Sequence, residues 1–256
     1  MRNNSNRLSR VRSVVRATEI LKCLGNGVER LTDISSKLNL NKATTYRLLK
    51  TLEVSGFVFQ DPGTQRFYLG HMIVQLASNP TISHQSLIIC AFDDMQYLRD
   101  LTEESVGLQI KVGAQRMFLE VLPSNQNIRF TLEKGYVAPL HIGAGGKVLL
   151  SELPENERQM ILDSTKLVIM RTNKIIDKEA LRREVNQIKK KGYAITFGET
   201  IPGSGGISIP IKNYVCPVVL GIFGPEDRIK KNLMNFLKMV KESAERISGK
   251  LLEMGA

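Results

Sequence analysis

The stretch NKATTYRLLKTLEVSGFV, from Asn41 to Val58, predicts a helix with two different faces. Asn41 is a favoured N-cap residue and Gly56 a favoured residue just past a helix end, so we expect a helix over 41–55. At 3.6 residues per turn, one side carries residues that can enter a core, namely Thr45, Leu48, Leu49 and Leu52. The opposite side carries Lys42, Ala43, Thr44, Tyr46, Arg47, Lys50 and Thr51.

The second of these faces has the composition of a surface that contacts a polyanion. No acidic residue lies between Asp33 and Glu53. A helix that enters the major groove brings short first-turn side chains to base edges, while hydroxyl and guanidinium groups bond phosphates or bases. An ordinary solvated face, the alternative, usually mixes acids with bases. We therefore predict contacts to DNA from Lys42, Ala43, Thr44, Tyr46 and Arg47.

The segments around this helix predict a winged helix-turn-helix. Apolar spacing predicts a first helix over 11–24, and a second over 33–38 that Thr32 can cap. After the third helix, the turn DPGT at 61–64 separates two short strand-like runs, which indicates a hairpin. Arg66 on this hairpin is expected to contact a phosphate or the minor groove; a surface arginine without such a contact is the alternative.

The charge distribution supports the same partner. The chain of 256 residues has a formal net charge of +11. Residues 1–79 hold twelve Lys/Arg and five Asp/Glu, whereas the remaining residues hold twenty-four and twenty. The first sixteen residues contain five arginines and no acid: Arg2, Arg7, Arg10, Arg12 and Arg16. A basic N-terminal third predicts a polyanionic partner, and a basic surface kept for solubility is the alternative.

The chain divides near Pro80, where Ser78, Asn79 and Thr81 surround the proline. We assign 1–70 to the DNA-binding domain with its basic tail, 71–81 to a linker helix, and 82–256 to a second domain. Helices are expected at 71–79, 82–102, 145–151, 155–162, 177–191 and 225–252. Strands are expected at 106–112, 115–122, 193–197, 206–211 and 217–223, with a further segment at 127–132. This order predicts an α+β fold, an antiparallel sheet with helices packed on it.

The sequence lacks the motifs that are typical of several function classes. The three cysteines and three histidines are scattered without CxxC or metal-ligand spacing, so we expect no metal site and no cofactor. The sequence contains neither GxSxG nor HExxH, which argues against an enzyme. The apolar runs are shorter than the roughly 20 residues of a membrane span, and the N-terminus has no apolar signal region. We therefore expect a cytoplasmic protein with no membrane partner.

Five blocks resemble, in order and spacing, the IclR family of bacterial transcription regulators. They are LTDISSKLNLNKATTYRLLKTLEVSGFV, RFYLG, PLHIGAGGKVLLSELP, KKKGYAITFGETIPGSGGISIPI and LGIFGPEDRI. The resemblance implies a winged helix that binds operator DNA as a dimer and a linker helix. It also implies a C-terminal effector-binding domain related to the GAF and PAS folds, in a homodimer or homotetramer.

The same resemblance implies an effector site at the block PLHIGAGGK. Ala144 and Gly145 match the positions whose backbone N–H groups hold a carboxylate in family members, and a helix N-terminus with small residues suits an anion. Taken alone, GAGGK favours a tight strand-to-helix turn over an anion site, and its glycine spacing is not that of a P-loop. The other implied effector-binding positions are Thr196, Gly206, Ser208, Gly221 and Phe223.

These positions depart from the family pattern for small 2-oxo acids. Polar side chains are lost at Gly206 and Gly221, Thr196-Phe197 stands where that pattern has an acid, and Phe223 adds an aromatic ring. We expect an effector larger and more apolar than a two- or three-carbon acid, for instance an aromatic carboxylate. The predicted function is thus a ligand-responsive regulator that binds a near-palindromic operator through 41–55. The alternative is a DNA-binding protein whose C-terminal domain only drives oligomerisation.

Overall fold

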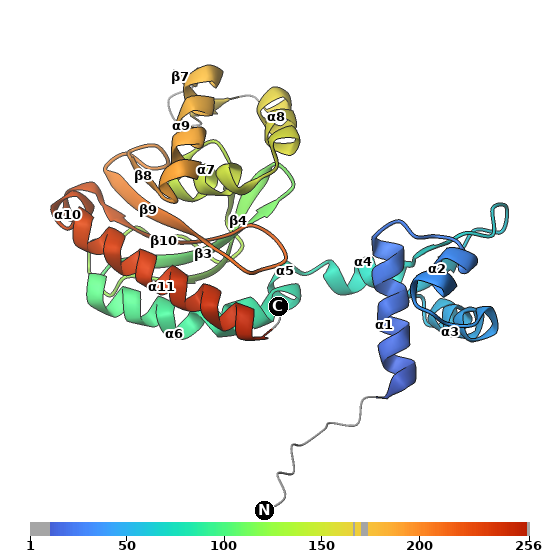
Figure 1. The fold of residues 1–256 in the computed structure, drawn as a ribbon. Helices are drawn as coiled ribbons and strands as arrows, with labels where there is room; N and C mark the ends of the chain where they lie inside the picture. The colour runs from blue at the N-terminus through green and yellow to red at the C-terminus, as the bar shows by residue number, and fades with distance from the viewer. Residues whose placement is uncertain (1–10, 166, 170–173, 255–256) are drawn as a thin grey trace, which may run out of the picture. The chain divides into compact units, whose positions relative to one another are not determined.

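The computed structural model describes residues 11–165, 167–169 and 174–254 and divides the chain into two compact units (Figure 1). The first unit ends at Ser83 and the second begins at His84. Of the five N-terminal arginines that we expect to favour a polyanion, Arg2, Arg7 and Arg10 lie outside the described residues.

The first unit is a winged helix-turn-helix followed by two short helices. Its elements are α1 (Arg12–Gly25), α2 (Leu31–Lys37), α3 (Lys42–Val54), β1 (Val58–Gln60), β2 (Phe67–Leu69), α4 (His71–Ala77) and α5 (Pro80–Ser83). β1 and β2 pair antiparallel across the predicted turn. The prediction that Thr32 caps α2 is wrong, because α2 begins at Leu31 with Arg30 at the N-cap position. Thr32 lies in the first turn, where its hydroxyl donates to Asp33 Oδ1 at 3.0 Å.

α3 has the two faces predicted for it. The Asn41 side chain accepts a hydrogen bond from the Thr44 N–H at 2.7 Å, which is the expected N-cap. Thr45 and Leu49 are fully buried, and Leu48 and Leu52 are partly buried. The small core around them consists of Ile20, Cys23, Leu24, Ile34, Leu49, Val58 and Phe67.

Two of the predicted helices are interrupted in the structure. The helix expected over 82–102 is α6 (Gln85–Thr102), and His84 separates it from α5, of which Pro80 is the first residue. The helix expected over 225–252 consists of α10 (Glu226–Lys231) and α11 (Leu233–Met254) with Asn232 between them. Pro225, the first residue of the expected helix, instead ends strand β10 (Val218–Pro225) and occupies the N-cap of α10.

The second unit is built on a six-stranded, fully antiparallel sheet in the order β5-β4-β3-β10-β9-β8. Its strands are β3 (Ser105–Val112), β4 (Gln115–Leu122), β5 (Val137–Pro139), β8 (Ala194–Phe197), β9 (Ser204–Ile211) and β10 (Val218–Pro225). β5 was not predicted, and the segment expected at 127–132 forms no strand. A separate pair joins β6 (Val168–Ile169) to β7 (Lys174–Ile175).

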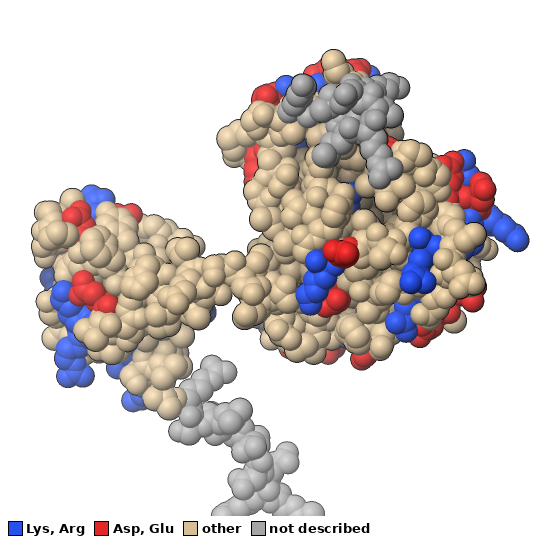
Figure 2. Space-filling view, turned by 180° about the vertical axis from the view of Figure 1, so that it is seen from behind, with Lys and Arg blue, Asp and Glu red and all other residues tan. Residues whose placement is uncertain are grey.

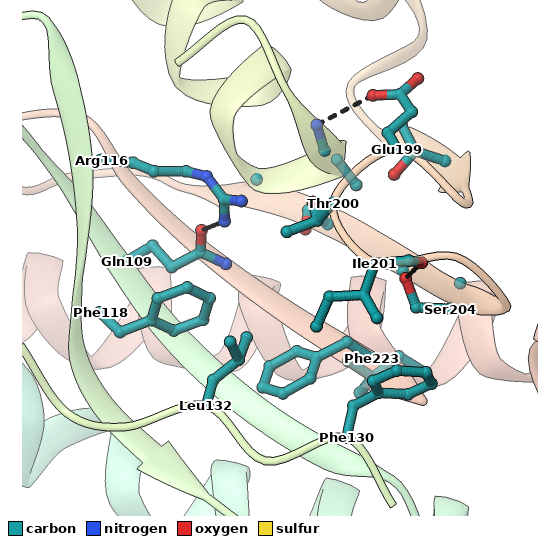
Figure 3. A pocket seen from close by; sticks show the side chains of 18 of the residues that line it. Gln109, Arg116, Phe118, Phe130, Leu132, Glu199, Thr200, Ile201, Ser204 and Phe223 are labelled. Carbon is teal, nitrogen blue, oxygen red and sulfur yellow. Dashed lines mark hydrogen bonds between the residues drawn. The ribbon is translucent and has the colours of Figure 1, made fainter. Parts of the chain in front are cut away.

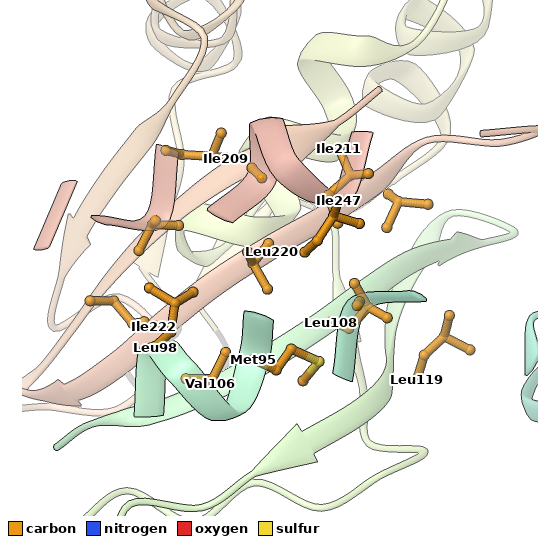
Figure 4. Packing of buried hydrophobic residues seen from close by; sticks show 14 of the residues in the cluster. Met95, Leu98, Val106, Leu108, Leu119, Ile209, Ile211, Leu220, Ile222 and Ile247 are labelled. Carbon is orange, nitrogen blue, oxygen red and sulfur yellow. The ribbon is translucent and has the colours of Figure 1, made fainter. Parts of the chain in front are cut away.

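Helices cover both faces of this sheet (Figure 1). α6 and α11 pack together on one face, and α7 (Gly143–Glu152) and α9 (Lys178–Lys191) lie on the other, with α8 (Glu155–Ser164) beside them. Figure 4 shows the main core between the sheet and the first pair, formed by residues such as Met95, Leu98, Leu108, Leu220 and Ile247. The predicted fold class is confirmed for both units.

Candidate functional site

The polar face of α3 is the first candidate site. Lys42, Ala43, Tyr46 and Arg47 are exposed and Thr44 is partly buried. Among the residues that the structure describes, neither Lys42 nor Arg47 has an ion-pair partner. Figure 2 shows Lys and Arg side chains gathered on this unit, interrupted by small acidic groups. The two cations are therefore available to a ligand in solution.

Two other cations near α3 are engaged within the protein. The Lys50 ammonium donates to Glu53 at 2.7 Å and to Gln60 at 2.9 Å, which fastens α3 to the base of the hairpin. Arg66 Nη1 lies 3.1 Å from Glu29 Oε2, and this hydrogen bond raises the pKa of Arg66. Arg66 therefore supports the hairpin, and a contact from it to DNA would compete with Glu29.

The second candidate site is a cavity in the second unit, between the sheet and the first turn of α7 (Figure 3). Its empty volume is about 520 Å³, including the part open to solvent. Strands β3, β4, β8, β9 and β10 and the loop 198–204 contribute its walls. The lining residues are Gln109, Arg116, Phe118, Phe130, Leu132, Gly143, Ala144, Gly145, Thr196, Gly198, Glu199, Thr200, Ile201, Ser204, Gly205, Gly206, Ser208, Ile222 and Phe223.

A β-bulge brings the strand residues of this cavity together. In the β3–β4 pair, Gln109 lies opposite Phe118 while Leu108 lies opposite Glu120, so Leu119 is the extra residue. Side chains two residues apart share a face of a sheet, so Arg116 and Phe118 point to the same side as Gln109. The bulge thereby directs a cation, an amide and an aromatic ring towards α7.

Arg116 forms the polar end of the cavity. Its side chain belongs to a residue that is only 4% exposed, and Nη1 donates to Gln109 Oε1 at 2.7 Å. Nε is buried and has no hydrogen-bond partner among the described residues. Burial lowers the pKa of Arg116 to about 10, opposed by Tyr136 and Glu199. The guanidinium therefore stays protonated at neutral pH, and its Nε–H donor has no acceptor among the described residues.

The start of α7 lies against this guanidinium. Gly143 has a φ of 75°, and a Cβ there would lie 2.8 Å from Thr200 Oγ1 and 3.2 Å from Arg116 Nη2. A Cβ on Gly145 would lie 2.3 Å from Gln109 Oε1. Glycine at both positions lets the amide and the guanidinium approach the first turn of the helix, whose N–H groups have no partner within the helix.

Glu199 accepts a hydrogen bond from one of those N–H groups and forms an ion pair with Lys147 instead of Arg116. Its Oε2 accepts from the Gly143 N–H at 2.9 Å, and its Oε1 lies 2.6 Å from the Lys147 ammonium. Lys147 is itself buried and also contacts Glu184 at 2.7 Å. The two carboxylates therefore compensate Lys147, and no carboxylate of the described residues lies within 4.0 Å of Arg116.

The other end of the cavity is aromatic. The rings of Phe118 and Phe223 meet edge to face with centroids 5.7 Å apart, and Phe130, Leu132 and Ile201 lie near them in Figure 3. A Cβ on Gly107 would lie 2.6 Å from Phe118 and 2.9 Å from Phe223, so this glycine leaves the space that the rings occupy. The cavity thus has one cationic end and one apolar end, and the two adjoin at Phe118, whose ring centre lies 5.5 Å from the guanidinium carbon of Arg116.

Most of the effector positions implied by the resemblance line this cavity. They are Ala144, Gly145, Thr196, Gly206, Ser208 and Phe223. Gly221 is not among the lining residues: it pairs with Ser208 across β9 and β10, and a Cβ there would lie 2.6 Å from the Ser208 hydroxyl. Gln109, Arg116 and Glu199 also line the cavity but were not predicted. Arg116 and Phe118 are two residues apart in the strand 115–122, a spacing that puts both on one face of a strand but does not by itself mark a binding site.

The described residues offer neither a metal site nor a membrane-spanning helix. Among residues 11–165, 167–169 and 174–254, no group of three or more His, Cys, Asp or Glu could hold a metal ion. In the same part of the chain, no helix is both long and apolar enough to cross a bilayer.

Two family models match most of the chain. The IclR helix-turn-helix domain matches residues 13–62, and the bacterial transcriptional regulator IclR C-terminal domain matches residues 80–249. The transcriptional repressor AllR of Escherichia coli K12 is 28% identical over 225 residues, which cover 87% of this chain and 83% of AllR. The regulator KdgR of the same strain is 27% identical over 245 residues, 94% of this chain and 93% of KdgR.

Solved structures show the same fold. The IclR protein of Thermotoga maritima is 25% identical with a TM-score of 0.62, covering 96% of this chain and 100% of that one. An IclR homologue from Microbacterium hydrocarbonoxydans, solved in complex with 4-hydroxybenzoate, is 20% identical with a TM-score of 0.61. That match covers 94% of this chain and 99% of the homologue.

Proposed function

This chain belongs to the IclR family of bacterial transcriptional regulators, and we propose that it binds a near-palindromic operator through α3 and responds to a small carboxylate-bearing effector. We propose that it acts in the cytoplasm as a homodimer or homotetramer and catalyses no reaction. The first unit would then recognise DNA, and the second would bind the effector.

The DNA-binding half of this proposal is supported by the exposed face of α3. Lys42 and Arg47 have no ion-pair partner among the described residues, and Ala43, Thr44 and Tyr46 lie on the same helix. In a helix-turn-helix dimer, two such helices enter successive major grooves about 34 Å apart, which is why the operator is expected to be near-palindromic. Arg66 is a weaker candidate for a DNA contact, because Glu29 binds its guanidinium.

The effector half is carried by one observation, the buried cation at the polar end of the cavity. A domain that served only for oligomerisation would gain nothing from an unpaired buried guanidinium, which is unfavourable in a protein interior. The aromatic end favours an effector with a ring. The relative from Microbacterium hydrocarbonoxydans holds such a compound, 4-hydroxybenzoate, and the same class of aromatic acid fits the two ends of the cavity in this chain.

Regulation requires that the effector bind two states of the protein with different affinity. We propose that the segment 71–81, which contains α4 and the first two residues of α5, is the linker through which effector binding alters DNA binding. The DNA affinity can shift only by the difference in effector affinity between the two states.

The DNA-binding proposal is tested with duplexes that the full chain selects from a random-sequence pool. Binding of the selected duplex is measured by fluorescence anisotropy for wild type, Arg47→Ala and Arg183→Ala. Loss of Arg47 is expected to cost about 1 to 3 kcal/mol of binding free energy. Arg183, an exposed arginine on α9, is the control and is expected to leave binding unchanged. Equal affinities for all three proteins would remove α3 from the interface.

The effector proposal is tested by thermal stabilisation with a panel of small acids. An effector present at 100 times its dissociation constant should stabilise the protein by about 2.7 kcal/mol. A melting temperature that depends on protein concentration and on none of the acids would instead favour the oligomerisation module.

A further inference from the structure

We propose that Arg116 holds the anionic group of the effector and that the effector is an aromatic monocarboxylate whose ring packs against the Phe118–Phe223 pair. The inference deepens the proposed effector response and rests on it. It adds a specificity-determining residue that lies outside the GAGGK block and names the chemical class of the ligand.

The first step is the uncompensated charge of Arg116. The residue is only 4% exposed, its side-chain hydrogen bond goes to the neutral amide of Gln109, and its guanidinium carbon lies 5.5 Å from the centre of the Phe118 ring. Glu199, the acidic residue in the cavity lining, is already bound by Lys147 and by the Gly143 N–H. A buried charge without a counter-ion is destabilising, so a carboxylate supplied from outside would complete an ion pair that the folded chain leaves open.

The second step is the arrangement of donors around Arg116. Nε is buried and unpartnered, and Nη2 lies beside the start of α7. Because Gln109 Oε1 accepts from Nη1, the amide nitrogen of Gln109 is left as a donor on the same side, next to Gly145. A carboxylate can accept two parallel bonds from a guanidinium, and the first turn of a helix offers further N–H donors. The polar end therefore fits a planar carboxylate.

The third step limits the ligand to one carboxylate and gives it a ring. Among the residues lining the cavity, Arg116 is the one cation. The apolar end is walled by Phe118, Phe130, Leu132 and Phe223, and the centre of the Phe118 ring lies 5.5 Å from the guanidinium carbon. A second carboxylate in that end would lose its water without gaining a partner. An aromatic ring there would instead pack edge to face or offset against the phenylalanines, as they already pack against each other.

The test compares acids with neutral molecules of the same shape on the full chain, by calorimetric titration. The probes are benzoate and 4-hydroxybenzoate, their amides benzamide and 4-hydroxybenzamide, and the dicarboxylate terephthalate. Wild type is expected to bind at least one of the two benzoates, and to bind it at least about 10-fold more tightly than its amide and than terephthalate.

The variant for this test is Arg116→Met, and Arg158→Met is its matched control. Both arginines are buried and each has one nitrogen without a partner, but Arg158 lies on α8, contacts Glu155 and does not line the cavity. Arg116→Met is expected to weaken benzoate binding by about 100-fold and to lose the preference for acid over amide. Arg158→Met should keep both. Without ligand, Arg116→Met should melt at or above the wild-type temperature, because the unpaired charge is gone.

Three results would overturn the inference. These are unchanged benzoate affinity in Arg116→Met, equal affinity of wild type for benzoate and benzamide, and stabilisation of wild type by glyoxylate or pyruvate but by no aromatic acid. If Arg116→Met does not fold, the ratio of acid to amide affinity in wild type still decides the point. DNA binding by wild type is measured separately. If wild type bound no DNA, the proposed regulator function would be contradicted, while the anion site would still be tested by the titrations.

Discussion

The face of α3 and the cavity of the second unit both present arginine to a negatively charged ligand, but in opposite surroundings. Arg47 is exposed on a helix in the first unit, whereas Arg116 is 4% exposed beneath the first turn of α7. Water and salt ions already solvate the first charge, while the second is hydrogen-bonded to one neutral amide and lies over the Phe118 ring. The same side chain is thus suited to a polyanion in one place and to a single carboxylate in the other.

This difference has an energetic basis. Exposed cations gain affinity for DNA largely by releasing condensed counter-ions, which makes binding depend steeply on salt. A buried cation interacts with its ligand through a medium that salt ions do not enter, so screening is weak. The contrast between the two sites is therefore measurable by changing ionic strength alone.

The largest expected effect is this salt dependence. If the DNA-binding units of a dimer together neutralise six to ten phosphates, DNA affinity should fall by about 10³- to 10⁵-fold between 50 and 200 mM salt. Over the same range, the affinity for a bound benzoate should change by less than about 3-fold. Anisotropy and calorimetry on one preparation give both slopes. A similar salt dependence of DNA and effector affinity would mean that the two arginines are in similar surroundings, and it would contradict the difference proposed between the two sites.

A smaller effect is expected from a methyl group added beneath the cavity. A Cβ on Gly146 in α7 would lie 2.4 Å from the Leu140 carbonyl oxygen. This is a backbone atom, which cannot move away by a rotamer change as a side chain could. Gly146→Ala should lower the free energy of unfolding of the second unit by about 1 to 3 kcal/mol, as overpacking does. DNA affinity without effector should hardly change, since the α3 face is formed by the first unit alone.

Gly249→Ala is the control for that change. Gly249 is a helical glycine in α11 of the same unit, is exposed and has no atom within 4 Å of an added Cβ. Alanine there should stabilise the unit by about 0.5 to 1 kcal/mol because glycine is a poor helix former. Chemical denaturation followed by circular dichroism gives both values, and a stabilising Gly146→Ala would contradict the close packing of α7 on Leu140.

A further small effect is expected at the start of α3. Asn41→Ala removes the side chain that accepts from the Thr44 N–H and should cost the first unit about 1 kcal/mol of stability. Asn41→Asp keeps the cap and should keep the stability, yet it should weaken DNA binding because it adds an acid to a face that has none. Melting curves and anisotropy separate the two effects, and an Asp variant that binds DNA normally would place the start of α3 away from the phosphates.

The sequence predicted the first site more completely than the second for a physical reason. The face of α3 depends on a 3.6-residue period, an Asn cap and a glycine stop, all within residues 41–56. The cavity depends on contacts between residues far apart in the chain: Gln109 with Arg116, Gly143 with Glu199, and Gly107 with two phenylalanines. The resemblance supplied Ala144 and Gly145 of α7 and the lining positions Gly206 and Ser208 of β9, but no local pattern marked Arg116.

The interruptions of the long helices show the same limit. His84 and Asn232 separate α5 from α6 and α10 from α11, although neither residue belongs to a proline or glycine signal. His84 Nδ1 lies 2.8 Å from the Tyr214 hydroxyl, a contact across 130 positions of sequence. Periodicity alone predicts continuous helices there, because such a partner is invisible to it.

The sequence by itself determined the order of elements, the two faces of α3, the basic N-terminal third and the family of the chain. Only the tertiary structure decided which charges are compensated. Lys147 and Arg116 are both buried basic residues, yet two carboxylates reach the first and none reaches the second. Which acids reach a buried cation depends on strand register, on the bulge at Leu119 and on the position of the loop 198–204, and these are set by the packing of the whole unit.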